Sequence, residues 1–390
     1  MAKSTQKKFS VGLTIFLSLV FLIVGAFGGL VASFLYDKHK NPIFKSDVVY
    51  GDGISFHFLE LGNNNTGDSI FIQTSTTDIL VDAGSRTNSA DTIETYVKDK
   101  MQDDVLEYVI ATHADQDHIA ALAGSNEHPS LFTRFQVQNI IDFPKTNKSL
   151  TTDAGNDTVY GKYVKNRDAE VAAGATHYSA LELWNDQTKR SIEIGNNITL
   201  NILYNYFYEH NSSDENNYSV CFQIEDGNNK FLFTGDLEEE GEEYLVQNNT
   251  LSKVKLFKAG HHGSPTSSND CLLDVIQPEI CVACCCAGSV EYTDNLENTF
   301  PSQAFINRIS KWTTKVYVPT VGTIVADGTK SDGSTDYKDS GVTSLNGNIV
   351  VTSSRGEITV ECSNNNTVLK DTDWFKENRT TPTAWATATA

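Results

Sequence analysis

Four apolar runs in this sequence end in Asp or His, and this repetition constrains the fold more than any other feature. The runs and their polar ends are Ile79-Leu-Val-Asp82, Ile110-Ala-Thr-His113, Phe231-Leu-Phe-Thr-Gly-Asp236 and Phe257-Lys-Ala-Gly-His261-His262. Loops that follow strands can converge on a cleft, where catalytic and ligand-binding residues are concentrated. One polar strand end is common, but four in one chain are hard to explain as ordinary turns.

The second of these ends holds the densest group of candidate metal ligands. His113, Asp115, Asp117 and His118 fall within six residues. Imidazole suits zinc, iron and manganese, whereas carboxylates favour harder ions. A bound metal lowers the pKa of its water and thereby supplies hydroxide for hydrolysis at neutral pH. A solvated polar loop is the alternative, and the similar ends of the other runs disfavour it.

The order of the predicted elements favours two sheets covered by helices on their outer faces. Apolar and alternating runs predict strands at residues 54–60, 70–73, 79–82, 108–111, 198–203, 219–224, 230–234, 254–257, 280–286, 315–318, 349–352 and 357–361. Helices are predicted at residues 90–103, 169–173, 238–246, 270–276 and 302–311. Residues 327–340 predict an inserted surface loop, and the Thr- and Ala-rich tail from residue 378 predicts disorder.

A long apolar segment near the start of the chain predicts a membrane anchor. Residues 9–36 contain no charged residue and no His, and as a helix they would span about 42 Å, more than the ~30 Å hydrocarbon core. A cleaved signal peptide is the alternative, because Val31-Ala32-Ser33 offers small residues to a peptidase. Equal numbers of lysines precede and follow the segment, so the positive-inside rule indicates only weakly which end lies in the cytoplasm. The short tail at residues 1–8 favours a single-pass protein with an extracellular domain, or a secreted one after cleavage.

Composition limits the partners and the compartment. The formal net charge of −20 argues against a general nucleic-acid binder, although a bound cation can reverse the local field and permit a nuclease. Four of the seven cysteines fall in the stretch Cys281–Cys286, which predicts a buried strand with Cys as a small hydrophobe. The odd number is mild evidence against a strongly oxidising compartment.

The order of the motifs resembles the metallo-β-lactamase superfamily. These motifs are Asp-Ala-Gly at 82–84, Thr-His-x-Asp-x-Asp-His at 112–118, Thr-Gly-Asp at 234–236 and His-His-Gly-Ser at 261–264. Gly67-Asp68-Ser69 and Asn216-Asn217-Tyr-Ser219 extend the similarity to the soluble hydrolase domain of ComEC-type DNA-uptake proteins. The resemblance implies an α+β fold, a four-layer αββα sandwich at residues 50–365. One transmembrane helix and a linker at 37–49 would precede it, and a partly disordered tail at 366–390 would follow.

The resemblance also implies roles for individual residues. Asp117 and His118 would hold one metal position, Asp236 would bridge, and one His of the pair would complete the site, with His261 preferred over His262. His113 and Asp115 would hold the other position, and Asp82 would orient ligands from behind. Further supporting or substrate-contacting residues are Asp68, Asn217, Ser219 and Ser264. Asp117 and Asp236 are the expected catalytic residues, with one or two divalent ions, zinc or manganese, as cofactors.

Two departures from the superfamily pattern bear on the number of metal ions. Asp115 stands where the commoner pattern has a second His, and Asn216 and Asn217 stand where a third His is usual, unless His210 reaches the site. Both changes favour one metal or a harder ion such as manganese. ComEC-type proteins carry a many-helix channel and this chain has one apolar span, so the uptake role does not transfer.

The leading functional hypothesis is a phosphodiesterase or nuclease that uses metal-bound hydroxide. Ser264, Ser267 and Ser268 would donate hydrogen bonds to phosphate oxygens. The alternatives are a hydrolase of another ester, amide or thioester, because the fold hosts many chemistries, and a surface binding protein with a degenerate site. Nucleic acid is a possible partner that the net charge disfavours, and no protein partner is identifiable from the sequence.

The predicted topology can be tested on intact cells. Protease added outside should digest the domain if residues 9–36 anchor it with the domain exported. Protection in intact cells together with digestion after lysis would reverse this orientation.

Overall fold

The computed structural model describes residues 53–387, except residues 102 and 332. The anchor predicted at 9–36 and the linker at 37–49 lie outside the described residues. Within the described part of the chain, no helix is both long enough and apolar enough to cross a membrane.

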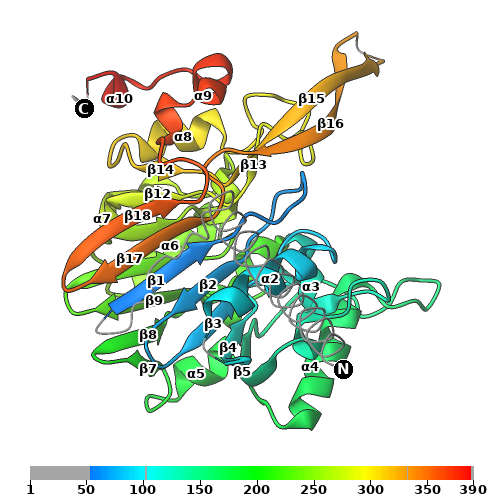
Figure 1. The fold of residues 1–390 in the computed structure, drawn as a ribbon, viewed down its shortest axis with the longest axis vertical. Coiled ribbons are helices and arrows are strands. Elements are labelled where there is room, and N and C mark those ends of the chain that lie inside the picture. The colour runs from blue at the N-terminus through cyan, green and yellow to red at the C-terminus, as the bar shows by residue number, and fades with distance from the viewer. Residues whose placement is uncertain (1–52, 102, 332, 388–390) are drawn as a thin grey trace, which may run out of the picture. The chain divides into compact units, whose positions relative to one another are not determined.

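Two large sheets form the centre of the fold (Figure 1). The eight-stranded sheet has the order β18-β17-β1-β2-β3-β4-β5-β6, and the seven-stranded sheet has the order β14-β12-β11-β10-β9-β8-β7. The strands of the first sheet are β1 Gly53–Phe58, β2 Ile70–Gln73, β3 Asp78–Val81, β4 Val105–Ile110, β5 Gln136–Asp142, β6 Thr176–Ser179, β17 Ile349–Ser354 and β18 Glu357–Cys362. Those of the second are β7 Ser191–Gly195, β8 Ile198–Ile202, β9 Phe222–Asp226, β10 Asn229–Phe233, β11 Leu256–Lys258, β12 Ile280–Val282 and β14 Val316–Tyr317.

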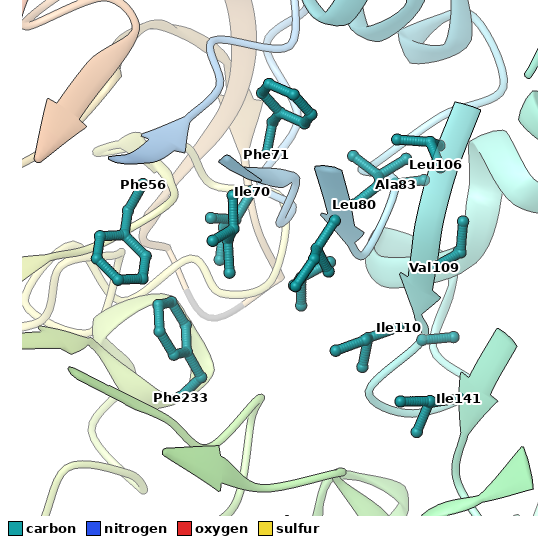
Figure 2. Packing of buried hydrophobic residues seen from close by; sticks show 14 of the residues in the cluster. Phe56, Ile70, Phe71, Leu80, Ala83, Leu106, Val109, Ile110, Ile141 and Phe233 are labelled. Atoms are coloured by element: carbon teal, nitrogen blue, oxygen red, sulfur yellow. The ribbon is translucent and has the colours of Figure 1, made fainter. Parts of the chain in front are cut away.

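Alternating side chains bury the core between the two sheets. Phe56 of β1 lies 4.6 Å from Phe231 and 5.7 Å from Phe233 of β10, measured between ring centroids. Figure 2 shows Ile70 of the next strand on the same side of the sheet as Phe56, whereas Phe71 points to the opposite side. Burying one side chain of this size contributes roughly 1.5–3 kcal/mol to the free energy of unfolding. The packing between the two sheets is therefore a main source of the domain's stability.

Helices cover the outer faces of both sheets. Leu232 points away from its neighbours in β10 and joins Phe257 and residues of α6, α7 and α8 in a second buried cluster. On the other sheet, the side chain of His57 points away from Phe56 and contacts Tyr96 of α2. The helices are α2 Ser89–Lys100, α3 Gln116–Ala123, α4 Val159–Ala173, α5 Ala180–Asn185, α6 Glu239–Asn248, α7 Asp270–Ile276, α8 Gln303–Ile309, α9 Asp373–Asn378 and α10 Thr383–Thr387. The predicted α+β sandwich of αββα layers is confirmed.

Half of each sheet is parallel, and this determines where the loops meet. Strands β3 to β6 pair in parallel, and so do β10, β11, β12 and β14. In open sheets of parallel strands, ligands bind in the crevice outside the carboxyl ends of those strands. The apolar runs that end in Asp or His therefore place these residues along common edges.

The structure differs from the sequence prediction in several segments. It adds elements that the sequence did not predict, among them α3, β5, β6, α5 and β7. Residues 327–340 fall within an antiparallel hairpin, β15 Thr320–Thr329 and β16 Thr335–Ser344, rather than a loop, and this hairpin forms a third sheet with β13 Cys286–Ala287. The predicted helix at 169–173 is the end of the longer α4. The single strand predicted at 280–286 is divided between β12 and β13, which belong to different sheets.

The end of the chain also differs from the expected disordered tail. Residues before 388 form the short helix η5 Leu369–Asp371 and then α9 and α10. Trp385 is only 3% exposed, and its Nε1 donates a hydrogen bond to the carbonyl of Thr313 at 2.8 Å. Leu369 and Phe375 are also fully buried, so a few isolated apolar side chains attach a segment whose Thr- and Ala-rich end carries no periodic signal.

The cysteines behave as predicted. Cys281, Cys284, Cys285 and Cys286 are all buried. No disulfide joins any of the seven cysteines, which all lie in the described part of the chain. Burial raises the pKa of the Cys286 thiol to about 12, so this side chain stays protonated and apolar at neutral pH.

His57 should make the fold acid-sensitive. Burial and the charge of Lys100 lower the pKa of His57 from 6.5 to about 3, and its ring nitrogens lie 2.9 Å from Tyr96 Oη and Ser55 Oγ. As the pH falls, the unfolded chain binds the proton before the folded protein does. The contribution of neutral His57 to the free energy of unfolding is therefore complete above about pH 6.5. It is lost as the pH falls towards 3, by up to about 1.4 kcal/mol per pH unit. Urea unfolding of the wild type and His57→Gln across this window should show a steeper acid loss in the wild type. Parallel pH curves would contradict the assignment.

Candidate metal centre

The candidate centre lies where the carboxyl ends of strands from both sheets come together. Asp82 follows β3, and His118 lies near the start of α3, in the segment that follows β4. From the other sheet, Asp236 follows β10 and His262 lies in the short helix η4 Gly260–Gly263 after β11. Each of these side chains is nearly or fully buried.

Four residues bring their ligand atoms to a common point. One atom each from Asp68, His118, Asp236 and His262 lies within 4.8 Å of the others. The Nε2 atoms of His118 and His262 are 3.3 Å apart. Asp236 Oδ2 is 3.0 Å from the first nitrogen and 2.9 Å from the second. Asp117 adds an oxygen 3.2 Å from His262 Nε2.

These separations fit the coordination shell of one divalent cation. Tetrahedral ligands at about 2.0–2.1 Å from an ion lie about 3.3–3.4 Å from one another, and octahedral neighbours at about 2.1 Å lie about 3.0 Å apart. Mixed imidazole and carboxylate ligands suit zinc and manganese. The donor set is therefore suitable for a metal, and His118, His262, Asp236 and Asp117 are the residues that would hold it. Asp68, the remaining member of the cluster, lies 3.0 Å from His262 Nδ1 and pairs with Lys258, so it would support the ligands rather than face the Nε2 atoms.

Hydrogen bonds behind the imidazoles fix which nitrogen faces the centre. His118 Nδ1 donates to Asp82 Oδ2 at 2.8 Å, and Asp82 also accepts from the backbone and hydroxyl of Thr112 at 2.8 and 2.7 Å. His262 Nδ1 donates to the carbonyl of Cys284 at 2.9 Å. Such partners set the ring orientation of a metal-binding His, so both Nε2 atoms point inward.

The backbone around the centre adopts conformations that most residues avoid. Asp82, His261 and His262 have φ angles of 57°, 44° and 57°, which cost of order 1–3 kcal/mol each for residues other than Gly. Gly235 has φ 55°, and a Cβ there would lie 2.7 Å from Ser219 Oγ. This strain accompanies the tight turns that aim Asp236 and His262 at one point.

A buried lysine that the sequence analysis missed completes the charge balance. Lys258 at the end of β11 is 1% exposed, and its Nζ lies 2.9 Å from Asp236 Oδ1 and 2.5 Å from Asp68 Oδ2. Burial raises the pKa of Asp236, but His118, His262 and Lys258 outweigh it and hold that pKa well below its usual range. A charged residue within the apolar run Phe257-Lys-Ala-Gly was the available signal, because a buried lysine requires an anionic partner.

The structure brings His262, and not His261, into the cluster. His262 belongs to the cluster, whereas Nδ1 of His261 lies 3.1 Å from Glu238 Oε1. Both residues have left-handed backbone in η4, so consecutive side chains point in different directions. The structure therefore differs from the sequence preference for His261, which instead lines the mouth of the pocket.

His113 and Asp115 lie beside the cluster rather than in it. The His113 Nε2 atom is buried and accepts or donates no hydrogen bond among the described residues, and it lies 3.5 Å from Asp115 Oδ2. Asp115 forms an ion pair with Lys148. His210, considered as a replacement third His, stacks on Tyr206 with ring centroids 3.8 Å apart.

Most of the other expected supporting residues hold loops. Ser219 Oγ accepts a hydrogen bond from the backbone N–H of Asp236 at 3.0 Å, and Asn217 Oδ1 accepts from that of Glu238 at 3.2 Å. Asp68, expected only in a supporting or substrate-contacting role, lies in the cluster itself.

The three serines have structural partners instead of a free face towards a phosphate. Ser264 Oγ bonds Thr266 Oγ1 at 2.7 Å, Ser267 Oγ donates to the carbonyl of Leu237 at 2.6 Å, and Ser268 Oγ accepts from Gly260 N at 3.0 Å. Each is at most 1% exposed. These contacts and the burial disfavour the predicted role of the three hydroxyls in binding a substrate.

A pocket of about 520 Å³ opens onto the centre. Its lining residues are Arg86, Asp115, Gln116, Asp117, Asn216, Asp236, His261, Glu291 and Tyr292. Tyr292 Oη donates a hydrogen bond to Asp117 Oδ2 at 2.9 Å, and Arg86 pairs with Glu291 at 2.5 Å. Substrate therefore has access to the Asp117 side of the cluster.

The chain contains a metallo-beta-lactamase superfamily domain, the fold of a class of hydrolases, and the cluster is a candidate metal site of that class. The model of this superfamily matches residues 62–129 and 214–286, which include Asp68, His118, Asp236 and His262.

The similar curated proteins carry competence and recombination names. "Recombination protein 2" of Haemophilus influenzae is 35% identical over 68 residues, which are 17% of this chain and 8% of that protein. "ComE operon protein 3" of Bacillus subtilis is 26% identical over 178 residues, 45% of this chain and 20% of that protein. "Competence protein ComA" of Neisseria gonorrhoeae is 36% identical over 104 residues, 26% of this chain and 14% of that protein. The chain thus matches at most a fifth of the length of these relatives.

Among solved structures, the metallo-beta-lactamase fold protein YhfI from Bacillus subtilis is 13% identical. The alignment covers 68% of this chain and 86% of that one, with a TM-score of 0.35.

Removing the charge behind His118 should weaken metal binding. In Asp82→Asn the amide oxygen can still accept a hydrogen bond from Thr112, but the amide N–H₂ then faces His118 Nδ1. This arrangement favours the tautomer with the proton on Nε2, the nitrogen that should bind the metal. Loss of such a partner lowers metal affinity roughly 10–100-fold, measurable by competition with a chromophoric chelator. Asp91→Asn is the matched control, because Asp91 pairs with His128 Nδ1 at 2.7 Å on the surface. Equal affinities in all three proteins would contradict the role of Asp82.

Proposed function

We propose that this chain is a metal-dependent hydrolase of phosphodiester bonds. The observation that carries the proposal is the convergence of two imidazole nitrogens and the Asp236 and Asp117 oxygens at separations of 2.9–3.3 Å. A divalent ion held there would supply Lewis acidity and lower the pKa of a coordinated water. The pocket beside Asp117 gives a substrate access to that position.

The chain's own residues would position the reaction. Asp82 and the Cys284 carbonyl keep the two imidazoles oriented, so no reorganisation is needed when an ion or a substrate binds. Lys258 holds Asp236 from the side opposite the imidazoles. Tyr292 Oη stands 2.9 Å from Asp117 Oδ2 at the pocket, where it can donate a hydrogen bond to an oxygen of the substrate instead.

The phosphodiester assignment rests on the relatives and on charge. The relatives' names refer to competence and recombination, which favours a substrate derived from nucleic acid. The formal net charge of −20 disfavours a long polyanion, so short oligonucleotides or nucleotide diesters are the better substrates. The proposal retains the division of the chain into an anchor at 9–36 and a hydrolase domain from residue 50.

The adjacent histidines provide a matched test of the metal centre. His262→Ala should lose most of the bound metal because it removes a ligand nitrogen, whereas His261→Ala should retain it. Metal content of the purified proteins, measured by plasma mass spectrometry after manganese or zinc loading, separates the two. Equal retention in both variants would contradict the proposed centre.

Activity should follow the same pattern. Hydrolysis of bis(4-nitrophenyl) phosphate should disappear on chelation, return with manganese or zinc, and be absent in His262→Ala. Short single-stranded DNA, a cyclic dinucleotide, a thioester and a lactam should be compared under the same conditions. Turnover of the lactam or thioester alone would reject the phosphodiester assignment while leaving a metal-dependent hydrolase.

A further inference from the structure

Two lysines neutralise the carboxylates on the side of the centre where a second metal ion would bind. Asp115 is ion-paired with Lys148. Asp236 directs Oδ2 towards His118 and His262, whereas its Oδ1 lies 2.9 Å from Lys258 Nζ. A carboxylate that bridges two ions through both oxygens needs Oδ1 for the second ion. Asp115, which lies 3.5 Å from His113 Nε2, and Asp236 are thus already paired with ammonium groups of this chain.

The position of Lys148 is held by its own loop. Residues 145–148 lie beyond the carboxyl end of β5, on the same edge as Asp82 and His113. Thr146 Oγ1 and the backbone N–H of Asn147 each donate to the carboxylate of Glu215 at 2.7 Å. Glu215 is only 7% exposed, so the anchor of the loop is itself fixed in the domain.

The two lysines differ in their access to solvent. The Lys258 side chain is 1% exposed, whereas that of Lys148 is 41% exposed. Asp115, the partner of Lys148, lines the pocket that leads to the centre. An ammonium group beside this pocket can exchange its carboxylate for an anionic substrate, whereas the buried one cannot.

We propose that the centre holds one metal ion per chain and that Lys148 takes the place of a second ion by contacting the anionic group of the substrate. This inference rests on the proposed metal-dependent function. Lys148 lies outside the residues 62–129 and 214–286 that match the superfamily, so it is a contribution of this chain's own intervening segment. A phosphate or phosphodiester is the ligand that a lysine next to a cation would attract.

The number of ions can be measured without an assay of activity. The full chain in detergent should bind one manganese per chain by plasma mass spectrometry after loading and desalting. Its electron paramagnetic resonance spectrum should be the six-line signal of an isolated Mn²⁺. Two ions per chain with an exchange-coupled spectrum would overturn the proposal, whatever the activity.

The role of Lys148 should appear in anion binding. Calorimetric titration of the manganese-loaded chain with inorganic phosphate should show binding at least about tenfold weaker in Lys148→Met, because one charge-assisted contact is lost. Manganese content should be unchanged. Lys165→Met is the matched control, because Lys165 lies on α4 in the same segment, pairs with Asp157 just before that helix, and is 68% exposed. Unchanged phosphate affinity in Lys148→Met would overturn the proposal.

A second variant tests the role of Lys148 without removing its side chain, in case Lys148→Met fails to fold. Glu215→Gln keeps Lys148 but weakens the acceptors that hold its loop, so it should lower phosphate affinity less than Lys148→Met and leave manganese binding intact. For bis(4-nitrophenyl) phosphate, both variants should raise KM more than they lower kcat. Wild-type phosphate affinity in both variants would show that Lys148 only neutralises Asp115.

Failure of this inference is distinguishable from failure of the proposed function. A chain that binds one manganese and needs Lys148 for phosphate, but cleaves no phosphodiester, would retain the inference and reject the function. A chain that cleaves phosphodiesters with two coupled ions would retain the function and reject the inference.

Discussion

The buried charge network around Asp236 is the constraint on which the centre depends. Its carboxylate is 1% exposed and contacts Lys258, His118 and His262, and Lys258 in turn contacts Asp68. Burying an isolated charge is costly, and removing one partner of a buried pair leaves the other uncompensated. The groups are therefore mutually dependent, and the strained turns at Asp82 and His262 are retained because they keep opposite charges together.

The parallel halves of the two sheets give this network its geometry. The strands that precede Asp82 and the Thr112–His118 segment belong to one sheet, and those that precede Asp236 and His262 belong to the other. The packing of Phe56 against Phe231 and Phe233 fixes the separation of the two sheets. Ligand atoms on one sheet therefore lie at coordination distance from those on the other. The site therefore depends on the core as much as on its own hydrogen bonds, and the helices on the outer faces need contribute only α3, which carries Asp117 and His118.

The sequence predicted the layers and most of the cluster because these depend on local patterns. Apolar runs ending in Asp or His were sufficient to find His118, Asp236 and the His pair. The choice between His261 and His262 depends on backbone angles inside a four-residue turn, which no spacing rule encodes. Tyr292 lines the pocket and Lys148 pairs with its lining residue Asp115. Both come from loops that are remote in sequence, and neither has a local signal. The C-terminal helices were missed because a few isolated buried side chains, Leu369, Phe375 and Trp385, hold them rather than a periodic apolar pattern.

The sequence separation within the cluster has a consequence for how the protein matures. His118 contacts Asp236 across 118 residues and His262 across 144 residues. A ribosome-bound chain that has not yet exposed residue 262 can form most of the first sheet but lacks an imidazole from the second. A metal ion that needs both halves has little affinity for such an intermediate, and ligands that bind only the native state stabilise that state alone. If the proposed centre binds an ion, capture would thus follow the pairing of site-bearing strands from both sheets, and it would favour molecules in which the two halves have come together.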